Sequence, residues 1–138
     1  MNKPTAEALE IFKSLTPRGQ FAAVLEGMRG EEGQFFADTV TRIAAIWRDM
    51  PKTYETDGQG RDALARLHWF TSGCDWWLVE KDIDSDGDGQ IQAFGVADLG
   101  QGCRELGYIS LVEILDAGAE LDFHFTPVTV GEILKGGK

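Results

Sequence analysis

Cysteines and long apolar runs are both scarce in this sequence. Cys74 and Cys103 are the only cysteines among 138 residues, and two thiols in a cytosolic chain are more often reduced packing residues than a disulfide. No segment approaches the ~18 apolar residues needed to cross a bilayer. The N-terminal region also lacks the basic start, apolar run and cleavage site of a secretory signal. These absences predict a cytoplasmic protein with no membrane partner.

Positive charge is scarce as well. The chain has 13 lysines and arginines against 23 aspartates and glutamates, which gives a formal net charge of −10. Long-range repulsion from phosphates disfavours nucleic acid as a direct ligand, and it favours a cation or a basic protein. The imbalance lies in the second half of the chain. Residues 1–70 hold 9 basic and 10 acidic residues, whereas residues 71–138 hold 4 and 13.

The common catalytic motifs are missing. The sequence has no Gly-x-Ser-x-Gly elbow, no His-Glu-x-x-His and no Walker loop. Gly58, Gly60 and Ala63 match Gly-x-Gly-x-x-Ala, but a dinucleotide site needs that motif between a strand and a helix, and a turn before a strand explains these glycines. No catalytic residue is therefore predicted. A small hydrolase with a carboxylate pair, such as Glu80 with Asp98, is kept as an alternative.

Helical and strand patterns divide the chain. Apolar residues recur at helical spacing over residues 9–15, 21–28 and 36–47. Thr16 and Pro17 predict the N-cap and first turn of the second of these helices. The first part of the chain, residues 1–52, is therefore predicted to be helical.

From residue 63 the apolar period changes towards two, which is typical of strands. The strand-like runs are Ala63–Phe70, Trp76–Lys81, Ile91–Val96, Gly107–Ser110 and Leu121–Phe125. Ser110 with Glu113 and Thr129 with Glu132 fit the capping box, which predicts two short helices beside the sheet. The sequence therefore predicts one α+β domain over residues 1–138. In it, N-terminal helices pack on a mostly antiparallel sheet, and residues 63–134 form the strand-rich, acidic part.

Two neighbouring tryptophans lie on one predicted strand. Trp76 and Trp77 must point to opposite faces of the sheet, because side chains alternate along a strand. Packing against the helices is the favoured interpretation. The rival is an exposed aromatic contact at a protein interface, for which Trp77 is the candidate.

A calcium-loop pattern follows the second strand-like run. In Asp84-Ser85-Asp86-Gly87-Asp88-Gly89-Gln90, carboxylates alternate and a later glycine permits a tight turn. Calcium binds six to eight oxygens, and Asp84, Asp86, Asp88 and the Gln90 carbonyl are the candidate ligands. The pattern departs from an EF-hand at Gly95, where a bidentate glutamate is required, and predicted strands flank it. A weak calcium site and a solvated hairpin loop both remain open.

His68, Cys74, Cys103 and His124 are residue types that bind zinc. Structural zinc sites usually contain close pairs such as Cys-x2-Cys, and these four residues are widely spaced. The spacing therefore argues against a zinc site.

A family resemblance is carried by residues 63–134. The segments that carry it are Leu67-His68-Trp69-Phe70, Asp75-Trp76-Trp77-Leu78-Val79-Glu80-Lys81-Asp82, Ala93-Phe94-Gly95, Glu105-Leu106-Gly107-Tyr108-Ile109-Ser110, Glu113, Glu120-Leu121-Asp122 and Phe125-Thr126-Pro127. In this order and spacing, the chain resembles a domain family of unknown function found on bacterial plasmids, prophages and other mobile elements. Some proteins associated with that family are type II anti-CRISPR inhibitors, so the resemblance implies an anti-defence role. It transfers no catalytic residue.

Charge and resemblance together predict a non-enzymatic binding protein of a mobile element. Its acidic surface would engage a basic, nucleic-acid-binding protein, such as a defence nuclease. The predicted partner-binding residues are Asp82, Asp84, Asp86, Asp88, Asp98 and Trp77. A calcium-binding module is the first alternative and a small hydrolase the second.

Overall fold

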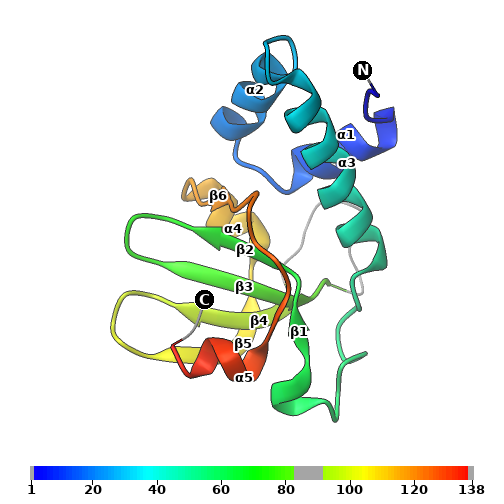
Figure 1. The fold of residues 1–138 in the computed structure, drawn as a ribbon. Coiled ribbons are helices and arrows are strands. Elements are labelled where there is room, and N and C mark those ends of the chain that lie inside the picture. Colours follow the sequence, from blue (N-terminus) through cyan, green and yellow to red (C-terminus); the bar gives the residue numbers. More distant parts are fainter. Residues whose placement is uncertain (1, 83–91, 137–138) are drawn as a thin grey trace.

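The computed structural model describes residues 2–82 and 92–136 (Figure 1). The helices in these ranges are α1 (Ala6–Ser14), α2 (Arg18–Gly27), α3 (Gly33–Asp49), α4 (Leu111–Asp116) and α5 (Val130–Leu134), with a 3-10 turn η1 (Gly60–Asp62). The strands are β1 (Leu64–Ala65), β2 (Leu67–Phe70), β3 (Asp75–Glu80), β4 (Ala93–Asp98), β5 (Arg104–Ile109), β6 (Glu120–Leu121) and β7 (Val128–Thr129). None of the helices within these two ranges is long and apolar enough to span a membrane.

Side-chain caps explain where several helices begin. The hydroxyl of Ser110 accepts from the Glu113 amide at 3.3 Å, and that of Thr129 accepts from the Glu132 amide at 3.2 Å. Ser110 and Thr129 therefore act as the N-caps that the sequence predicted, and the two short helices that they begin are confirmed. The prediction for Thr16 was wrong: its hydroxyl donates to a carbonyl of the preceding helix, and Pro17 occupies the N-cap position of α2.

The strands form an antiparallel sheet, which confirms the predicted α+β class. Within the described residues the sheet has five strands in the order β5-β4-β3-β2-β6, and each neighbouring pair is antiparallel. The predicted run Ala63–Phe70 divides at Arg66, because β1 pairs with β7 whereas β2 pairs with β3 and β6. Figure 1 shows the N-terminal helices above this sheet, α5 below it and β1 at its right side.

A large hydrophobic core joins the N-terminal helices to one face of the sheet. Phe12 and Leu15 of the first helical segment and Val40 of α3 are fully buried in it, beside Trp69 of β2. The indole Nε1 of Trp69 donates to the carbonyl oxygen of Leu15 at 2.8 Å. This bond satisfies the buried polar atom of the side chain and fixes the helices against the sheet.

A second core covers the opposite face. It contains Trp77 and Val79 of β3, Val96 of β4, and Val130 and Ile133 of α5. Trp76, by contrast, packs against the first core. The prediction that the two tryptophans point to opposite faces is confirmed.

Candidate functional site

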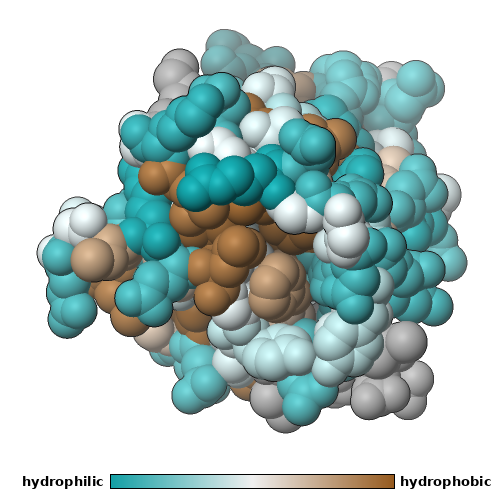
Figure 2. Space-filling model, turned by 90° about the horizontal axis from the view of Figure 1, so that it is seen from below, coloured by the Kyte–Doolittle hydropathy of each residue, from teal (hydrophilic) through white to brown (hydrophobic). Residues whose placement is uncertain are grey.

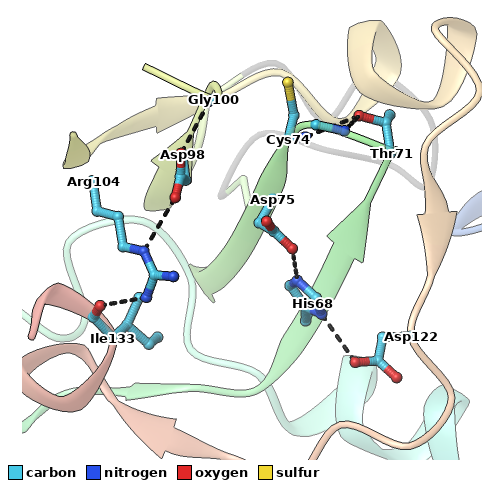
Figure 3. Close-up of polar contacts among 10 residues, drawn as sticks. His68, Thr71, Cys74, Asp75, Asp98, Gly100, Arg104, Asp122 and Ile133 are labelled. Carbon is cyan, nitrogen blue, oxygen red and sulfur yellow. Dashed lines mark hydrogen bonds and ion pairs between the residues drawn. The ribbon is translucent and has the colours of Figure 1, made fainter. Parts of the chain in front are cut away.

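A polar cluster centred on His68 lies on the second-core face of the sheet. Its Nε2 atom is 2.7 Å from Asp75 Oδ1, and its Nδ1 atom is 3.0 Å from Asp122 Oδ2 (Figure 3). The His68 ring stacks on Trp77, with 5.1 Å between the ring centroids. Each ring nitrogen therefore has a carboxylate partner.

Local backbone structure brings these carboxylates to the histidine. Thr71 and Cys74 close the β2–β3 hairpin, because the Thr71 amide donates to the Cys74 carbonyl at 2.9 Å and the Cys74 amide to the Thr71 hydroxyl at 3.1 Å. This turn places Asp75 at the start of β3. The Asp122 amide donates to the His68 carbonyl at 2.9 Å, which extends the pairing of β6 with β2.

Arg104 of β5 reaches the same cluster from the other side of Trp77. Its guanidinium carbon lies 4.7 Å from the Trp77 ring centroid. Its Nε atom donates to Asp98 at 3.2 Å, and one terminal nitrogen donates to the carbonyl of Ile133 at 2.7 Å (Figure 3). Hydrogen bonds from the Gly100 amide and then from Arg104 lower the pKa of the Asp98 carboxyl below its ordinary value. Arg104 thus ties the end of α5 to the sheet.

The cluster borders a hollow of about 470 Å³, which Phe125, Thr126 and His124 also line. Its charged side chains are largely turned towards one another: His68 bonds two carboxylates, and Arg104 bonds Asp98 and a backbone oxygen. Such a network holds the hairpin, the turn after β6 and α5 together.

The predicted partner-binding residues that the structure describes do not form an exposed surface. Trp77 is only 3% exposed, because His68 and Arg104 stack against it. Asp82 is 7% exposed, and its carboxylate accepts from the Gln92 amide at 3.0 Å. Asp98 is paired with Arg104. The prediction of surface contact by Trp77 and Asp82 is therefore corrected, since both side chains are buried.

The remaining predicted residues, Asp84, Asp86, Asp88 and Gln90, lie outside the described residues. Their flanks are described. Strands β3 and β4 bound the segment, as predicted, and Gly95 lies inside β4. The departure from an EF-hand is therefore confirmed.

The suggested acid–base pair of Glu80 and Asp98 is also corrected. Asp98 lies opposite Asp75 in the register of β3 and β4, at the far end of β3 from Glu80. Five residues of a strand span about 16 Å, which is too far for two carboxylates to share one substrate bond. Glu80 instead accepts from the backbone amides of Tyr54 and Thr56.

The four residues of types that bind zinc, His68, Cys74, Cys103 and His124, do not come together in one site. His68 and His124 border the same hollow, but Cys74 is half-buried, Cys103 is exposed, and both are free thiols. In the part of the chain that the structure describes, no three His, Cys, Asp or Glu side chains are placed to hold a metal ion.

The carboxylates that are exposed were not among the predicted site residues. Within residues 82–134, the exposed ones that the structure describes are Glu105, Glu113, Asp116, Glu120 and Glu132. A charge count along the chain could have found them. Residues 82–134 contain eleven acidic residues and one lysine or arginine, Arg104, and so carry a net charge of −10. This segment alone accounts for the whole formal charge of the protein.

Fold and cluster define an α+β protein with an antiparallel sheet covered on both faces. Residues 39–128 match the sequence profile of DUF2958, a family of proteins of unknown function, and the chain belongs to that family. The match begins inside α3, earlier than the segments that carry the resemblance described above. No curated protein and no solved structure matches the chain.

Proposed function

We propose that this protein is a non-enzymatic binding protein whose acidic surface engages a basic, nucleic-acid-binding protein. The observation that carries the proposal is the net charge of −10 in residues 82–134, with Arg104 as the single strong base of that segment. Arg104 is itself paired with Asp98. The negative field of this segment is therefore little offset from within.

Exposed carboxylates at the α4 end of the sheet are the best candidates for contact. Glu113 and Asp116 lie on α4, and Glu120 begins β6 just after it. All three are exposed, and Figure 1 shows α4 beside β6. Carboxylates on short, packed elements are held in place at little entropic cost, and they attract a basic partner from a distance.

The family resemblance suggests the class of partner. It points to mobile genetic elements and to inhibitors of type II CRISPR systems, whose effector nucleases bind nucleic acid in positively charged channels. In this proposal the exposed carboxylates take positions that phosphates would otherwise occupy. The protein then competes with nucleic acid for the effector.

The test is a competition assay with a purified type II CRISPR effector, its guide RNA and a labelled target DNA. We expect the protein to displace the DNA, and we expect the displacement to weaken steeply between about 50 and about 300 mM salt, because exposed charge pairs are screened. Absent or salt-insensitive displacement would overturn the proposal.

Charge-neutral variants locate the surface. We expect Glu113→Gln/Asp116→Asn/Glu120→Gln to raise the protein concentration needed for half-maximal displacement of the DNA at least about tenfold, since three favourable charge contacts are removed. The matched control is Glu26→Gln/Glu31→Gln/Glu32→Gln, which removes the same charge from exposed positions of the helical part. Equal losses in the two variants would show that net charge, and not this surface, determines binding.

A further inference from the structure

A second cleft, of about 250 Å³, lies between the loop that precedes β1 and the second-core face of β4 and β5. Tyr54 comes from the loop, Phe94 from β4, and Leu106 and Tyr108 from β5, with Val79 and Glu80 of β3 beneath them. Figure 2, which views the molecule from the end where β1 and α5 lie, shows hydrophobic side chains gathered near the middle of this face and polar ones around them. The cleft thus combines an apolar wall with a carboxylate.

Glu80 is an unusual residue at the base of a cleft. It is 3% exposed. One carboxylate oxygen accepts from the Tyr54 amide at 2.9 Å, and the other accepts from the Thr56 amide at 2.8 Å and from the Thr56 hydroxyl. No lysine, arginine or histidine of the described residues forms an ion pair with it. A glutamate buried to this extent normally has a cationic partner.

Three donors leave acceptor capacity on the carboxylate, since its two oxygens offer about four lone-pair positions. All three donors are neutral groups, so the negative charge of Glu80 is solvated by dipoles and is not cancelled. A cation that enters the cleft would meet both a free acceptor position and an uncancelled charge.

The wall of the cleft suits a cation on an apolar body. Phe94 and Tyr108 pack edge to face with 5.9 Å between ring centroids, and the hydroxyls of Tyr54 and Tyr108 lie 3.0 Å apart at the rim. Aromatic faces attract cations. The cleft is also anionic: the pKa of Tyr108 is raised, first by the hydrogen bond with Tyr54 and by burial, and further by the negative charges of Asp57 and Glu80.

The backbone of the loop is strained where it meets the cleft. Tyr54 has a φ of 74°, a left-handed conformation that is unfavourable for a bulky side chain. Two hydrogen bonds to Glu80, from the Tyr54 and Thr56 amides, hold this conformation. Glu80 therefore both shapes the cleft and supplies its charge.

We propose that this cleft binds a small organic cation, an ammonium or guanidinium group on an apolar body. The charged group lies at Glu80, and the apolar body packs against Phe94, Leu106 and Val79. The inference goes beyond the proposed function and does not depend on it, because the cleft is formed by residues other than the exposed carboxylates of α4 and β6.

Phenethylammonium and 2-phenylethanol are matched probes, because they share an aromatic body and differ in charge. We expect phenethylammonium to shift the backbone amide NMR signals of Tyr54 and Thr56 saturably. We expect 2-phenylethanol to bind at least about tenfold more weakly, since it lacks the charge-assisted hydrogen bond. Equal binding of the two probes, or no binding of the cation, would overturn the proposal. The proposal would also be overturned if a short arginine-containing peptide bound the cleft and phenethylammonium did not, because the occupant would then be a partner protein.

Two leucine variants test the location without removing Glu80, whose loss could unfold the loop. Leu106 lines the cleft and is 46% exposed, so Leu106→Lys should fold and place an ammonium group of its own beside the cleft. Leu99→Lys is the matched control at an exposed position outside the cleft lining. We expect at least about tenfold weaker phenethylammonium binding in the first variant and unchanged binding in the second. Unchanged binding in both would place the probe elsewhere and refute the assignment.

Discussion

Gly95 lies directly against the backbone carbonyl of Trp77 on the neighbouring strand. A Cβ atom at position 95 would fall 1.9 Å from that oxygen, and the register of β3 and β4 shifts just beyond this point, between Leu78 and Glu80. Only glycine permits such a close approach of two central strands. The same residue is the position at which the calcium-loop pattern departs from an EF-hand.

We therefore expect Gly95→Ala to lower the free energy of unfolding by about 3 kcal/mol, since one of two packed backbones must move. The matched control is Gly107→Ala. Gly107 is the cross-strand partner of Gly95 on β5, and a Cβ there would meet open space. Gly107→Ala should change the free energy of unfolding by no more than about 0.5 kcal/mol. Urea unfolding followed by tryptophan fluorescence measures both, and similar losses would refute the steric explanation.

His68 should stabilise the fold through its two carboxylates and through Trp77. His68→Ala removes the ring nitrogens that bond Asp75 and Asp122 and uncovers one face of the indole. We expect a loss of about 1–3 kcal/mol at neutral pH. His124→Ala, at an exposed position beside the same hollow, should change stability by no more than about 0.5 kcal/mol. Chemical denaturation of both variants makes the comparison, and an equal effect would contradict a special role for His68.

The contribution of Asp98 to the stability of the fold should be lost in acid. Its pKa is lowered in the folded protein, first by the Gly100 amide and then by Arg104. The unfolded chain therefore takes up this proton at a higher pH than the folded chain. The contribution is fully present above the ordinary value of about 3.9, and it is lost as the pH falls through the folded value.

Asp98→Asn should consequently lower the urea midpoint at pH 7, and the difference from the unmodified protein should shrink as the pH falls below 4. The carboxyl carbon of Asp98, followed by NMR, gives the titration directly. A midpoint at or above the ordinary aspartate value would contradict the assigned hydrogen bonds.

The aspartate-rich segment carries a separate prediction from sequence alone. Asp84, Asp86, Asp88 and Gln90 are predicted to bind calcium weakly, at millimolar concentrations, because the ligand count is short. Isothermal titration and a thermal shift measure this directly. Asp86→Asn should reduce both signals, whereas Asp116→Asn on α4 should leave them unchanged. Absence of heat and of a thermal shift in the unmodified protein would end the calcium alternative.

Local hydrogen bonding explains which parts of the fold were predictable. Ser110 and Thr129 bond amides three residues ahead, so the short helices that follow could be found from sequence alone. The division of the predicted run at Arg66 could not be found, because it depends on which distant strands pair with β1 and with β2. Pairing partners are a tertiary property, and no local pattern encodes them.

The polar cluster was not predictable for a similar reason. Asp122 lies 54 residues from His68, and it meets the histidine because β6 pairs with β2. Trp77 is the candidate for an exposed contact in the rival interpretation of the sequence, yet Arg104 and His68 cover it. Alternation along a strand tells which residues share a face, but it does not tell whether another layer covers that face.

The bond between the Trp69 indole and the Leu15 carbonyl has a consequence for where this protein can be cut. The family match begins at residue 39, in the middle of α3, yet Leu15 precedes it. A fragment trimmed to the matched segment would leave a fully buried tryptophan facing water on one side and its N–H without an acceptor. The start of the family match is therefore no safe place to shorten the chain, and deletions intended to isolate the acidic region should retain α1.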